Sequence, residues 1–466
     1  MKDSYDIVVI GGGLGGLTAA NRLARAGHAV LLTEQHSQLG GLATYFQRRE
    51  HIFDVALHGF PVGMKKSFRK YWGKDFADRV TQVKSIRFDN PQYSLDSTFD
   101  TSDFSAKLTG HFKISADTVK AFFAALAAAN YYDDQRETTR EFFNRFFPGR
   151  TDVWRFLMEP ITYANGSTLD EPAISYAIVF GNFMSEGVYT FTGGTDLMLR
   201  MMEDELRHNG VDVELSSCAE RIYVDGSRRV RAVSINGREV ACKAVVGNGS
   251  LPRLVHELVG DEHFAPDYLD KLKLVRLSSS SCQVYIGIKE GEKLPFIGDL
   301  LFTSTWPEFD AAALASRKIS SRTYSVYYPE IRPGTSKYSV VASMNALYGD
   351  WATMSKDEYR AAKKDMIEDT LNALSRYIPS IRSIADYTEA ATPKTFQRYT
   401  GHLAGATFGT KFEGLRPSMD IGKQVGGLYH TGSVGIIMSG WLGAANYGVI
   451  TANEVDRYLC TSRRNG

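Results

Sequence analysis

The feature that most constrains this chain is a glycine-rich turn between an apolar strand and a helix near its start. Residues 6–10 read DIVVI, residues 11–16 read GGGLGG, and residues 17–24 read LTAANRLA. A strand, a tight turn and a helix in this order bring the free N–H groups of the first helical turn against bare backbone, where a pyrophosphate binds. The pattern predicts a Rossmann-type dinucleotide cradle in an α/β fold.

Each glycine of the turn has a separate reason to be there. Gly11 permits the tight turn, Gly13 lets the backbone approach a pyrophosphate, and Gly16 lets the helix pack closely on the strand. We predict that Gly11, Gly13, Leu14, Gly15 and Gly16 bind the cofactor. The alternative is an ordinary glycine-rich turn without a ligand.

A carboxylate follows the next apolar strand. Residues 29–33 read AVLLT and lead to Glu34 and Gln35, at the spacing where an acidic side chain accepts hydrogen bonds from the adenosine ribose hydroxyls. A carboxylate at this place would repel a ribose phosphate, which argues against NADP. The alternative is a solvated strand end.

A second glycine pair distinguishes between nucleotides. Gly40, Gly41, Leu42 and Ala43 follow Glu34 closely, and an NAD site has no need of them. The segment resembles the extended fingerprint of glutathione-reductase-like flavoproteins of the amine oxidase and phytoene desaturase type. The resemblance implies that FAD is the cofactor and that these residues pass close to its diphosphate and ribityl chain.

Charge and cysteine content exclude other classes. Among 466 residues, 54 Lys and Arg balance 53 Asp and Glu, so no general positive field attracts nucleic acid. The four cysteines, Cys218, Cys242, Cys282 and Cys460, have neither zinc-site nor redox-pair spacing. We expect a reduced compartment and no metal site.

The chain also has features that bear on its location. The fold begins almost at once, so we expect no signal peptide, and no apolar run approaches the roughly 20 residues of a spanning helix. Residues 64–83 and 118–155 are predicted to be helical and are rich in aromatic residues, which fits plain core, a lipid-lined cavity or a membrane-docking face. We expect a cytoplasmic protein, peripheral on the cytosolic face of a membrane.

The middle of the chain returns to the nucleotide unit. Residues 221–224 and 230–235 alternate apolar and polar positions around Asp225-Gly226, which predicts a hairpin. A helix should begin near Gly193-Gly194 with Thr195 as its N-cap. The apolar run 244–246 leads to Asn248, which we assign to the cofactor site together with Ala219.

Several stretches resemble the phytoene desaturase family, in its branch with carotenoid isomerase and retinol saturase. Residues 187–189 (GVY) and 193–195 (GGT) resemble a segment typical of the desaturases. Residues 53–58 (FDVALH) resemble the FD-x-G-x-H element of the isomerase and saturase branch, as do residues 392–395 (TPKT) with 399–401 (YTG). Ala56 replaces the glycine of the FD-x-G element.

The C-terminal stretch completes the resemblance. Residues 427–433 (GLYHTGS) resemble the last flavin strand and turn, which implies cofactor roles for Gly432, Ser433, Ile437 and Gly440. Ser433 stands where most members carry Asp or Glu. A helix through residue 458 should direct its N-terminus at the flavin.

The resemblance implies a discontinuous architecture. A glutathione-reductase-like, Rossmann-type FAD domain should contain residues 1–83, 186–258 and 405–466. An α+β substrate domain with a helical, membrane-facing part should contain residues 84–185 and 259–404.

The implied reaction is hydride exchange between an allylic C–H of a long isoprenoid or carotenoid and flavin N5, as desaturation, saturation or isomerisation. We choose His58 first for the accompanying proton, with His402 and His430 as further catalytic candidates. Isomerisation requires no base. Quinone or O2 is the expected acceptor for a desaturase, because no second nucleotide fingerprint follows the first.

Two alternatives remain open. One is an amine oxidase or protoporphyrinogen-oxidase-like flavoenzyme, which shares the cradle. The other is a prenyl-binding escort protein similar to the Rab GDP-dissociation inhibitors, which would have no redox activity.

Overall fold

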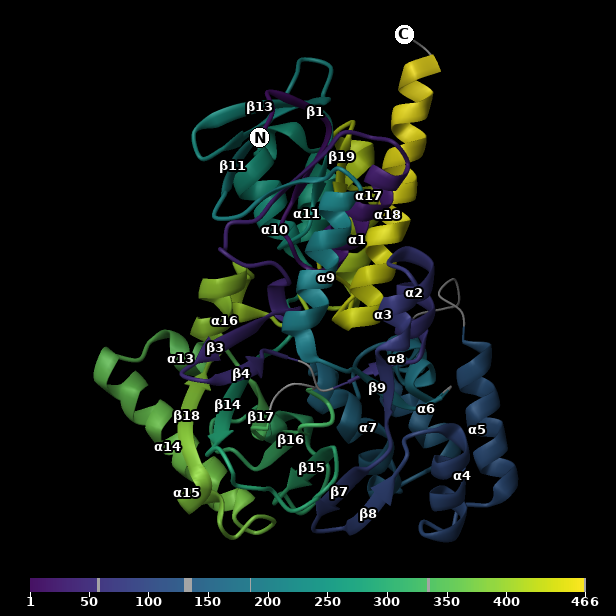
Figure 1. Cartoon of the computed structure of the whole chain (residues 1–466). Helices are drawn as coiled ribbons and strands as arrows, with labels where there is room; N and C mark the ends of the chain where they lie inside the picture. The colour runs from purple at the N-terminus through teal and green to yellow at the C-terminus, as the bar shows by residue number, and fades with distance from the viewer. Residues whose placement is uncertain (57–58, 130–135, 185, 333–335, 465–466) are drawn as a thin grey trace.

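The computed structural model describes residues 1–56, 59–129, 136–184, 186–332 and 336–464. Over these residues the chain forms an upper half that carries both chain ends and a lower half built on a second large sheet, as Figure 1 shows. The chain passes between the halves several times, as the discontinuous arrangement predicts.

The sheet of the upper half is built from apolar parallel strands. β1 (Ser4–Ile10) lies between β2 (Val30–Thr33) and β13 (Arg238–Gly247), all in parallel register. β10 (Asp212–Glu214) extends the sheet beyond β2, and β19 (Leu428–His430) pairs in parallel with β13. Helices cover these strands, so they are apolar on both faces, and the Rossmann-type prediction is confirmed.

The predicted hairpin is also present. β11 (Ala219–Val224) pairs in antiparallel register with β12 (Val230–Ile235), and β12 pairs in antiparallel register with the first residues of β13. The hairpin extends the nucleotide sheet on the side of β13.

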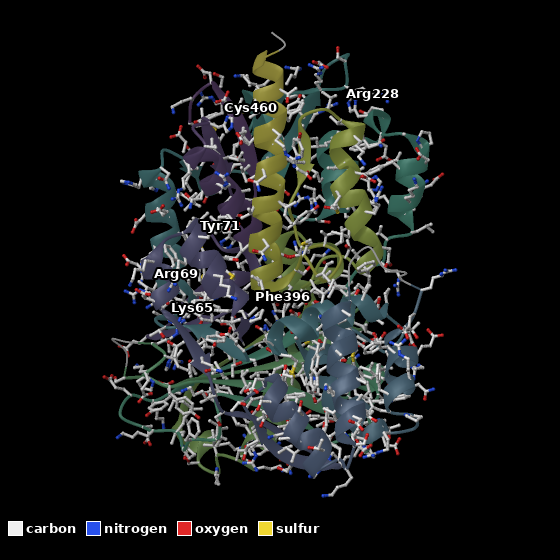
Figure 2. The ribbon with its side chains drawn as sticks, turned by 90° about the vertical axis from the view of Figure 1, so that its right-hand side faces the viewer. Lys65, Arg69, Tyr71, Arg228, Phe396 and Cys460 are labelled. Atoms are coloured by element: carbon white, nitrogen blue, oxygen red, sulfur yellow. The ribbon has the colours of Figure 1, made fainter. Side chains whose placement is uncertain are left out.

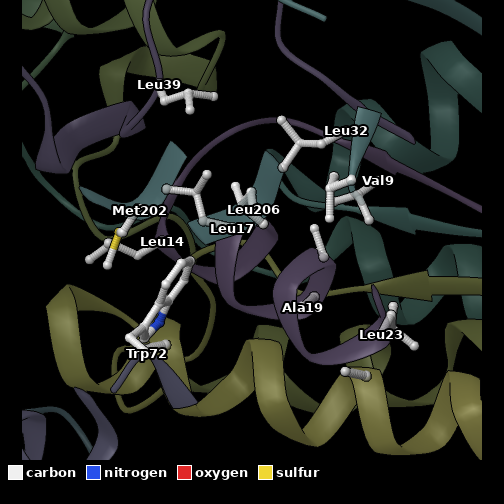
Figure 3. Packing of buried hydrophobic residues seen from close by; sticks show 14 of the residues in the cluster. Val9, Leu14, Leu17, Ala19, Leu23, Leu32, Leu39, Trp72, Met202 and Leu206 are labelled. Carbon is white, nitrogen blue, oxygen red and sulfur yellow. The ribbon is translucent and has the colours of Figure 1, made fainter. Parts of the chain in front are cut away.

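Helices α1 (Leu14–Arg25), α9 (Gly194–His208) and α18 (Gly440–Arg464) cover one face of this sheet. Figure 3 shows Leu17 of α1 beside Leu206 of α9, with Leu23 of α1 and Val9 of β1 in the same cluster. All four of these side chains are fully buried. The apolar face of α1 therefore fixes the helix against the strand that precedes it.

The start of α9 differs from the sequence prediction. Gly193 is its N-cap residue, and Thr195 lies inside the first turn. The Thr195 N–H donates to Oδ1 of Asp54 at 3.1 Å, and its hydroxyl donates to the same atom. An acidic side chain from a distant strand therefore accepts a hydrogen bond from a free N–H group of this helix N-terminus, which local capping rules do not anticipate.

The lower half is built on a mostly antiparallel sheet. Its order is β18 (Ala385–Ala391), β14 (Ser280–Ile288), β17 (Ser339–Ala346), β16 (Ser321–Tyr327), β15 (Leu300–Ser304), β7 (Ile86–Asn90) and β8 (Tyr93–Ser97). Val284 and Ile286 of β14 pack in one cluster with Leu371 and Leu374 of α14 (Lys356–Leu374). Gln283 and Tyr285 of β14, which alternate with these two residues, point to the opposite face of the sheet.

A group of aromatic-rich helices completes the lower half, and Figure 2 shows it below α18. The helices are α4 (Thr101–Gly110), α5 (Ala116–Ala128), α6 (Thr139–Phe146), α7 (Thr151–Asn165) and α8 (Ala173–Met184). Phe122, Phe143 and Phe147 are fully buried in their shared core, so the plain-core interpretation holds for them. Tyr131 and Tyr132 lie outside the described residues.

Shorter elements complete the two halves or connect them. They are β3 (Tyr45–Arg48), β4 (His51–Asp54), β5 (Phe60–Pro61), α2 (Gly63–Tyr71), α3 (Lys74–Asp78), β6 (Val80–Val83), β9 (Val188–Phe191), α10 (Leu251–Arg253), α11 (Pro266–Lys273), α16 (Pro393–Thr400) and α17 (Leu415–Gln424). In Figure 2, Phe396 of α16 lies where the two halves meet.

The predicted domain boundary at residue 258 needs a correction. Tyr268 and Leu272 of α11 pack in the core of the nucleotide half, together with Ile421 of α17. The Tyr268 hydroxyl also donates to the Pro417 carbonyl at 2.9 Å. The chain therefore leaves the nucleotide half only after α11, because the apolar face of this helix covers the sheet.

Among the described residues, no helix combines the length and the apolar character that crossing a bilayer requires.

Candidate cofactor and substrate site

A cavity of about 830 Å³ lies where the two halves meet. This volume is in the range of cofactor and ligand sites. The glycine turn before α1, the end of β2 and the loop before α18 line one part of it. Helices α7 and α8 and strands β14 and β17 line the other part. We call these the cradle side and the sheet side.

The glycine turn leaves no room for side chains on the cradle side. A Cβ on Gly11, whose φ is 101°, would lie 2.3 Å from the Asn248 carbonyl oxygen. A Cβ on Gly15 would lie 2.5 Å from the Thr431 carbonyl oxygen. Gly13 is the N-cap residue of α1 and has no side chain with which to cap it. The start of α1 can therefore serve an anionic ligand, as a diphosphate site requires.

Gly16 has a packing role. It lies behind the cavity wall, and a Cβ there would lie 2.1 Å from the carbonyl oxygen of Gly11. The close approach of α1 to β1 depends on this glycine, as predicted for the last position of the fingerprint.

The carboxylate of Glu34 is fixed at the cavity wall. Its Oε2 accepts a hydrogen bond of 2.7 Å from the Gly12 N–H, and its Oε1 accepts one of 2.8 Å from the His36 N–H. The residue is only 8% exposed. A carboxylate has about four acceptor positions, so Glu34 retains capacity for ribose hydroxyls.

The second glycine pair lies against the first. Gly40 bridges to Gly13 and donates its N–H to the Gly12 carbonyl at 2.7 Å. Gly40 and Gly41 have φ values of 109° and 58°, which favour glycine. The two fingerprint segments therefore form one continuous surface on the cradle side.

The loop before α18 closes the cradle side. A Cβ on Gly432 would lie 2.0 Å from the Gly249 carbonyl oxygen, so this turn also requires glycine. Ser433 and Ile437 line the cavity, and α18 begins at Gly440 on the same wall. The N-terminus of a long helix favours negative charge at this position.

Most predicted cofactor residues therefore meet at one wall. The wall includes Gly11, Gly13, Leu14, Gly15, Glu34, Gln35, Gly40, Gly41, Leu42, Ala43, Ala219, Asn248, Gly432, Ser433, Ile437 and Gly440.

The three catalytic candidates have different surroundings. His58 lies outside the described residues. His402 lines the cavity, and its Nδ1 lies 2.8 Å from the Ala406 carbonyl, to which it donates. Burial lowers the pKa of His402, which favours a neutral ring. With Nδ1 as the donor, Nε2 is an acceptor.

His430 does not fit a catalytic role, which corrects the prediction. It is absent from the cavity wall, and both ring nitrogens are bonded. Its Nε2 donates to the Gly249 carbonyl at 3.0 Å, and its Nδ1 accepts from the Ser418 hydroxyl at 2.6 Å. Burial lowers the pKa of His430 to about 4, so the ring is a neutral support for the turn at Gly249.

Sequence reasoning did not single out the polar residues of the sheet side. Asn165 of α7, Gln283 of β14 and Asn345 of β17 line the cavity there. The only signal was a pair of polar residues at alternate positions in each strand, Ser281 with Gln283 and Ser343 with Asn345. Arg253, at the end of α10, was also missed and lies on the cavity wall.

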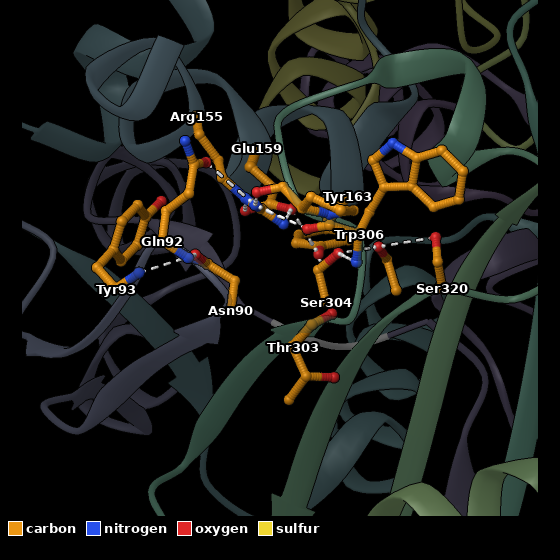
Figure 4. Close-up of polar contacts among 12 residues, drawn as sticks. Asn90, Gln92, Tyr93, Arg155, Glu159, Tyr163, Thr303, Ser304, Trp306 and Ser320 are labelled. Carbon is orange, nitrogen blue, oxygen red and sulfur yellow. Dashed lines mark hydrogen bonds and ion pairs between the residues drawn. The ribbon is translucent and has the colours of Figure 1, made fainter. Parts of the chain in front are cut away.

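A buried polar network supports the wall at α7 (Figure 4). Arg155, fully buried, pairs with Glu159 at 3.0 Å. The Tyr163 hydroxyl lies 3.0 Å from both the Glu159 carboxylate and the Thr303 carbonyl. Burial raises the pKa of the Tyr163 phenol well above its ordinary range. Tyr163 lines the cavity, so this network holds a wall residue in place.

A buried ion-pair cluster joins the two halves. Arg332, which follows β16, donates to Asp54 of β4 and, at 2.8 Å, to Asp196 of α9. All three residues are less than 8% exposed. The cluster fixes α9 and β4 to the lower half.

No group of described residues has three or more histidine, cysteine or acidic side chains arranged to hold a metal ion.

Comparison with known families agrees with this geometry. The model described as flavin containing amine oxidoreductase matches residues 14–435. The chain belongs to this family. Its cofactor is FAD, and the glycine-lined cradle with Glu34 and the helix start at Gly13 fits that group.

Curated relatives align with most of this chain. A chloroplastic prolycopene isomerase from Daucus carota is 22% identical over 97% of this chain and 80% of that protein. The human all-trans-retinol 13,14-reductase is 21% identical over 98% and 86%. A lycopene-forming phytoene desaturase from a Paracoccus species is 22% identical over 86% of each chain. The resemblance to this branch is confirmed at low identity.

Solved structures show the same fold. An oxidoreductase from Methanosarcina mazei superposes with a TM-score of 0.66 at 18% identity, covering 96% of this chain and 99% of that one. A putrescine oxidase bound to putrescine gives a TM-score of 0.66 at 14% identity, covering 97% and 99%. These structures share the predicted α/β architecture.

Proposed function

We propose that this protein is an FAD-dependent oxidoreductase acting on a long apolar isoprenoid, by desaturation, saturation or isomerisation. The observation that carries the proposal is the charge of the cavity wall. Among the described lining residues, the only permanently charged side chains are Glu34 and Arg253, and neither lies on the helices α7 and α8 or the strands β14 and β17 that form the sheet side. An amine or carboxylate substrate would meet no counter-charge on the sheet side.

The apolar wall can supply the binding energy for such a molecule. Ile178, Val179 and Phe183 of α8 line the cavity, together with Phe408 and Leu442. Burial of each CH2 is worth about 0.8 kcal/mol, so a long hydrocarbon chain binds without a charged anchor. These side chains also exclude water from the cavity.

Bound FAD supplies the hydride acceptor or donor for an allylic carbon. The protein's own contribution to proton movement rests with His402, whose neutral ring presents Nε2 as an acceptor. His58 remains a prediction, with loss of turnover but retention of flavin expected for His58→Ala.

The first experiment is the absorbance spectrum of the purified protein, followed by anaerobic addition of isoprenoids in liposomes. Bleaching of the flavin band by phytoene, a lycopene isomer or retinol supports oxidation of that compound. Geometric isomerisation by the chemically reduced protein supports the isomerase reaction. Bleaching by an amine instead, or absence of flavin, contradicts the proposal.

We also propose peripheral attachment to an anionic membrane, with quinone or O2 as the acceptor of a desaturase. The basic residues Lys65, Lys66, Arg69 and Lys70 lie on α2, and Figure 2 shows Lys65 and Arg69 beside α18. Helix α2 begins at Gly63, against Leu442 of the cavity wall. Co-sedimentation with anionic but not neutral vesicles, lost when these four residues become glutamine, tests the attachment.

A further inference from the structure

The sheet side of the cavity carries a compact group of neutral polar side chains. Ser281 pairs across the strands with Asn345, and Gln283 pairs with Ser343. Alternate residues of a strand share a face, so all four side chains lie on the face that lines the cavity. Asn165 joins them from α7. We call these five residues the amide patch.

Gln283 is buried but incompletely bonded. It is 3% exposed, and its Oε1 accepts a hydrogen bond from the Tyr285 hydroxyl. Its Nε2 makes no hydrogen bond to the described residues, and the side chain lines the cavity. The amide therefore presents one unsatisfied polar atom to the cavity.

Two more amides repeat this arrangement. Asn165 is 3% exposed, and its Oδ1 accepts from the Ser167 N–H at 2.8 Å, while its Nδ2 has no partner within the described chain. The Nδ2 of Asn345 donates to the Thr162 carbonyl at 2.6 Å, while its Oδ1 has none within the same residues. In each case a protein contact fixes one end of the amide.

Polar atoms inside a protein are almost always hydrogen-bonded to protein, ordered water or a ligand. Asn165 and Gln283 are buried, Asn345 is half-buried, and all three line the cavity, so a bound molecule can supply the missing partner. The patch contains donors and an acceptor but no charge, which suits a hydroxyl or carbonyl group. A hydroxyl both donates and accepts. It therefore suits the patch even if the oxygen and nitrogen of a side-chain amide exchange places.

We propose that the amide patch binds a neutral oxygen group of the substrate, which is therefore an oxygenated isoprenoid rather than a pure hydrocarbon. This inference rests on the proposed function and adds the substrate's polar group. The apolar wall of α8 would bind the isoprenoid chain, and the patch would fix its position along the cavity.

The test compares ligands that differ only in the oxygen group. Zeaxanthin with β-carotene and geranylgeraniol with its C20 hydrocarbon are such pairs. Affinities for the flavin-loaded protein are measured from the perturbation of the flavin spectrum. Each neutral hydrogen bond is worth a factor of about 2 to 13, so the alcohol of at least one pair should bind about tenfold more tightly.

Variants then locate the preference. Gln283→Leu and Asn345→Leu should each reduce the alcohol-to-hydrocarbon ratio about three- to tenfold while hydrocarbon binding is kept. Gln47→Leu, an exposed change on β3 outside the cavity wall, is the matched control and should keep the native ratio. Flavin content and thermal melting identify a variant that fails to fold. In that case the affinities of the native protein for the ligand pairs test the proposal.

The outcomes separate the two proposals. If hydrocarbon and alcohol bind equally, or if both leucine variants keep the native ratio, the amide patch proposal is overturned and the proposed function stands. If no isoprenoid of either kind binds, both fall.

Discussion

The backbone N–H of Gly12 donates a hydrogen bond of 2.7 Å to Oε2 of Glu34. This contact joins the glycine turn to the residue that follows β2, and the second carboxylate oxygen accepts from the His36 N–H. Glu34 therefore organises the cradle as well as offering acceptors to a ribose. Because it is buried and bonded to two N–H groups, both its charge and its shape contribute to the cofactor site.

We expect Glu34→Gln to weaken FAD binding by about tenfold or more, because hydrogen bonds to a charged acceptor are worth about 1.5–3 kcal/mol. The amide would also place an NH2 group against a backbone N–H. Titration of the apoprotein with FAD measures the affinity. Glu262→Gln, an exposed change outside the cavity wall, should bind FAD normally. Equal affinities in the two variants would contradict the role of Glu34.

Close packing of α18 on α1 should depend on Gly448. A Cβ at this position would lie 2.3 Å from the Gly15 carbonyl oxygen, in the fingerprint turn itself. Gly448→Ala should destabilise the protein by about 1–3 kcal/mol, the usual cost of overpacking.

Thermal melting checks this prediction. The matched control is Gly181→Ala in α8, where a Cβ meets nothing within 4 Å. Alanine is the better helix former there, so the control should be neutral or slightly stabilising. A melting temperature for Gly448→Ala as high as that of the control would show that α18 shifts without cost.

Arg332 should be essential to the junction of the halves. Arg332→Met leaves the carboxylates of Asp54 and Asp196 buried without their cation, which costs about 3–5 kcal/mol. Adding Asp54→Asn and Asp196→Asn to this variant should restore part of the loss, since the unpaired charges are then removed. Denaturant unfolding of the three proteins measures the difference, and additive losses would contradict the ion-pair account.

The buried ring of His430 should make stability depend on pH. Burial lowers its pKa to about 4 in the folded protein, against an ordinary value of 6.5. Below pH 6.5 this histidine becomes protonated in the unfolded chain, whereas it stays neutral in the folded protein until the pH approaches 4. Stability should therefore fall as pH decreases from 6.5 to 4, by about 3 kcal/mol in total from this group.

The comparison with His430→Gln isolates this effect from other titrating groups. The variant should be less stable than the native protein at pH 7, and the difference should shrink as the pH approaches 4. Denaturant unfolding at several pH values gives both curves. Parallel curves would mean that His430 does not titrate in this range.

The nucleotide half could be predicted in detail because its signals are local. The turn at Gly11, the strand that ends before Glu34 and the hairpin around Asp225 each follow from short stretches of chain with their own backbone requirements. The second pair, Gly40 and Gly41, indicated FAD through its resemblance to the extended flavoprotein fingerprint. Steric demands on the backbone act within a few residues, so sequence carries them directly.

The limits of local reasoning appear at single residues. Thr195 matched the rule for an N-cap, but Gly193 is the N-cap residue of α9, and Thr195 donates instead to Asp54 of the distant strand β4. His402 and His430 were equivalent in sequence, and only packing made one a wall residue and the other a support beneath Gly249. The role of such a residue depends on the elements that pack around it from other parts of the chain, and local periodicity does not indicate these contacts.

The sequence by itself determined the Rossmann-type unit, the FAD cradle and the family. The tertiary structure alone decided the buried cluster around Arg332 and the amide patch. Gln283 and Ser343 are far apart in the chain and become neighbours only through the pairing of β14 with β17. Strand pairing and burial bring distant residues together, and the chemistry of the substrate side arises from those long-range contacts.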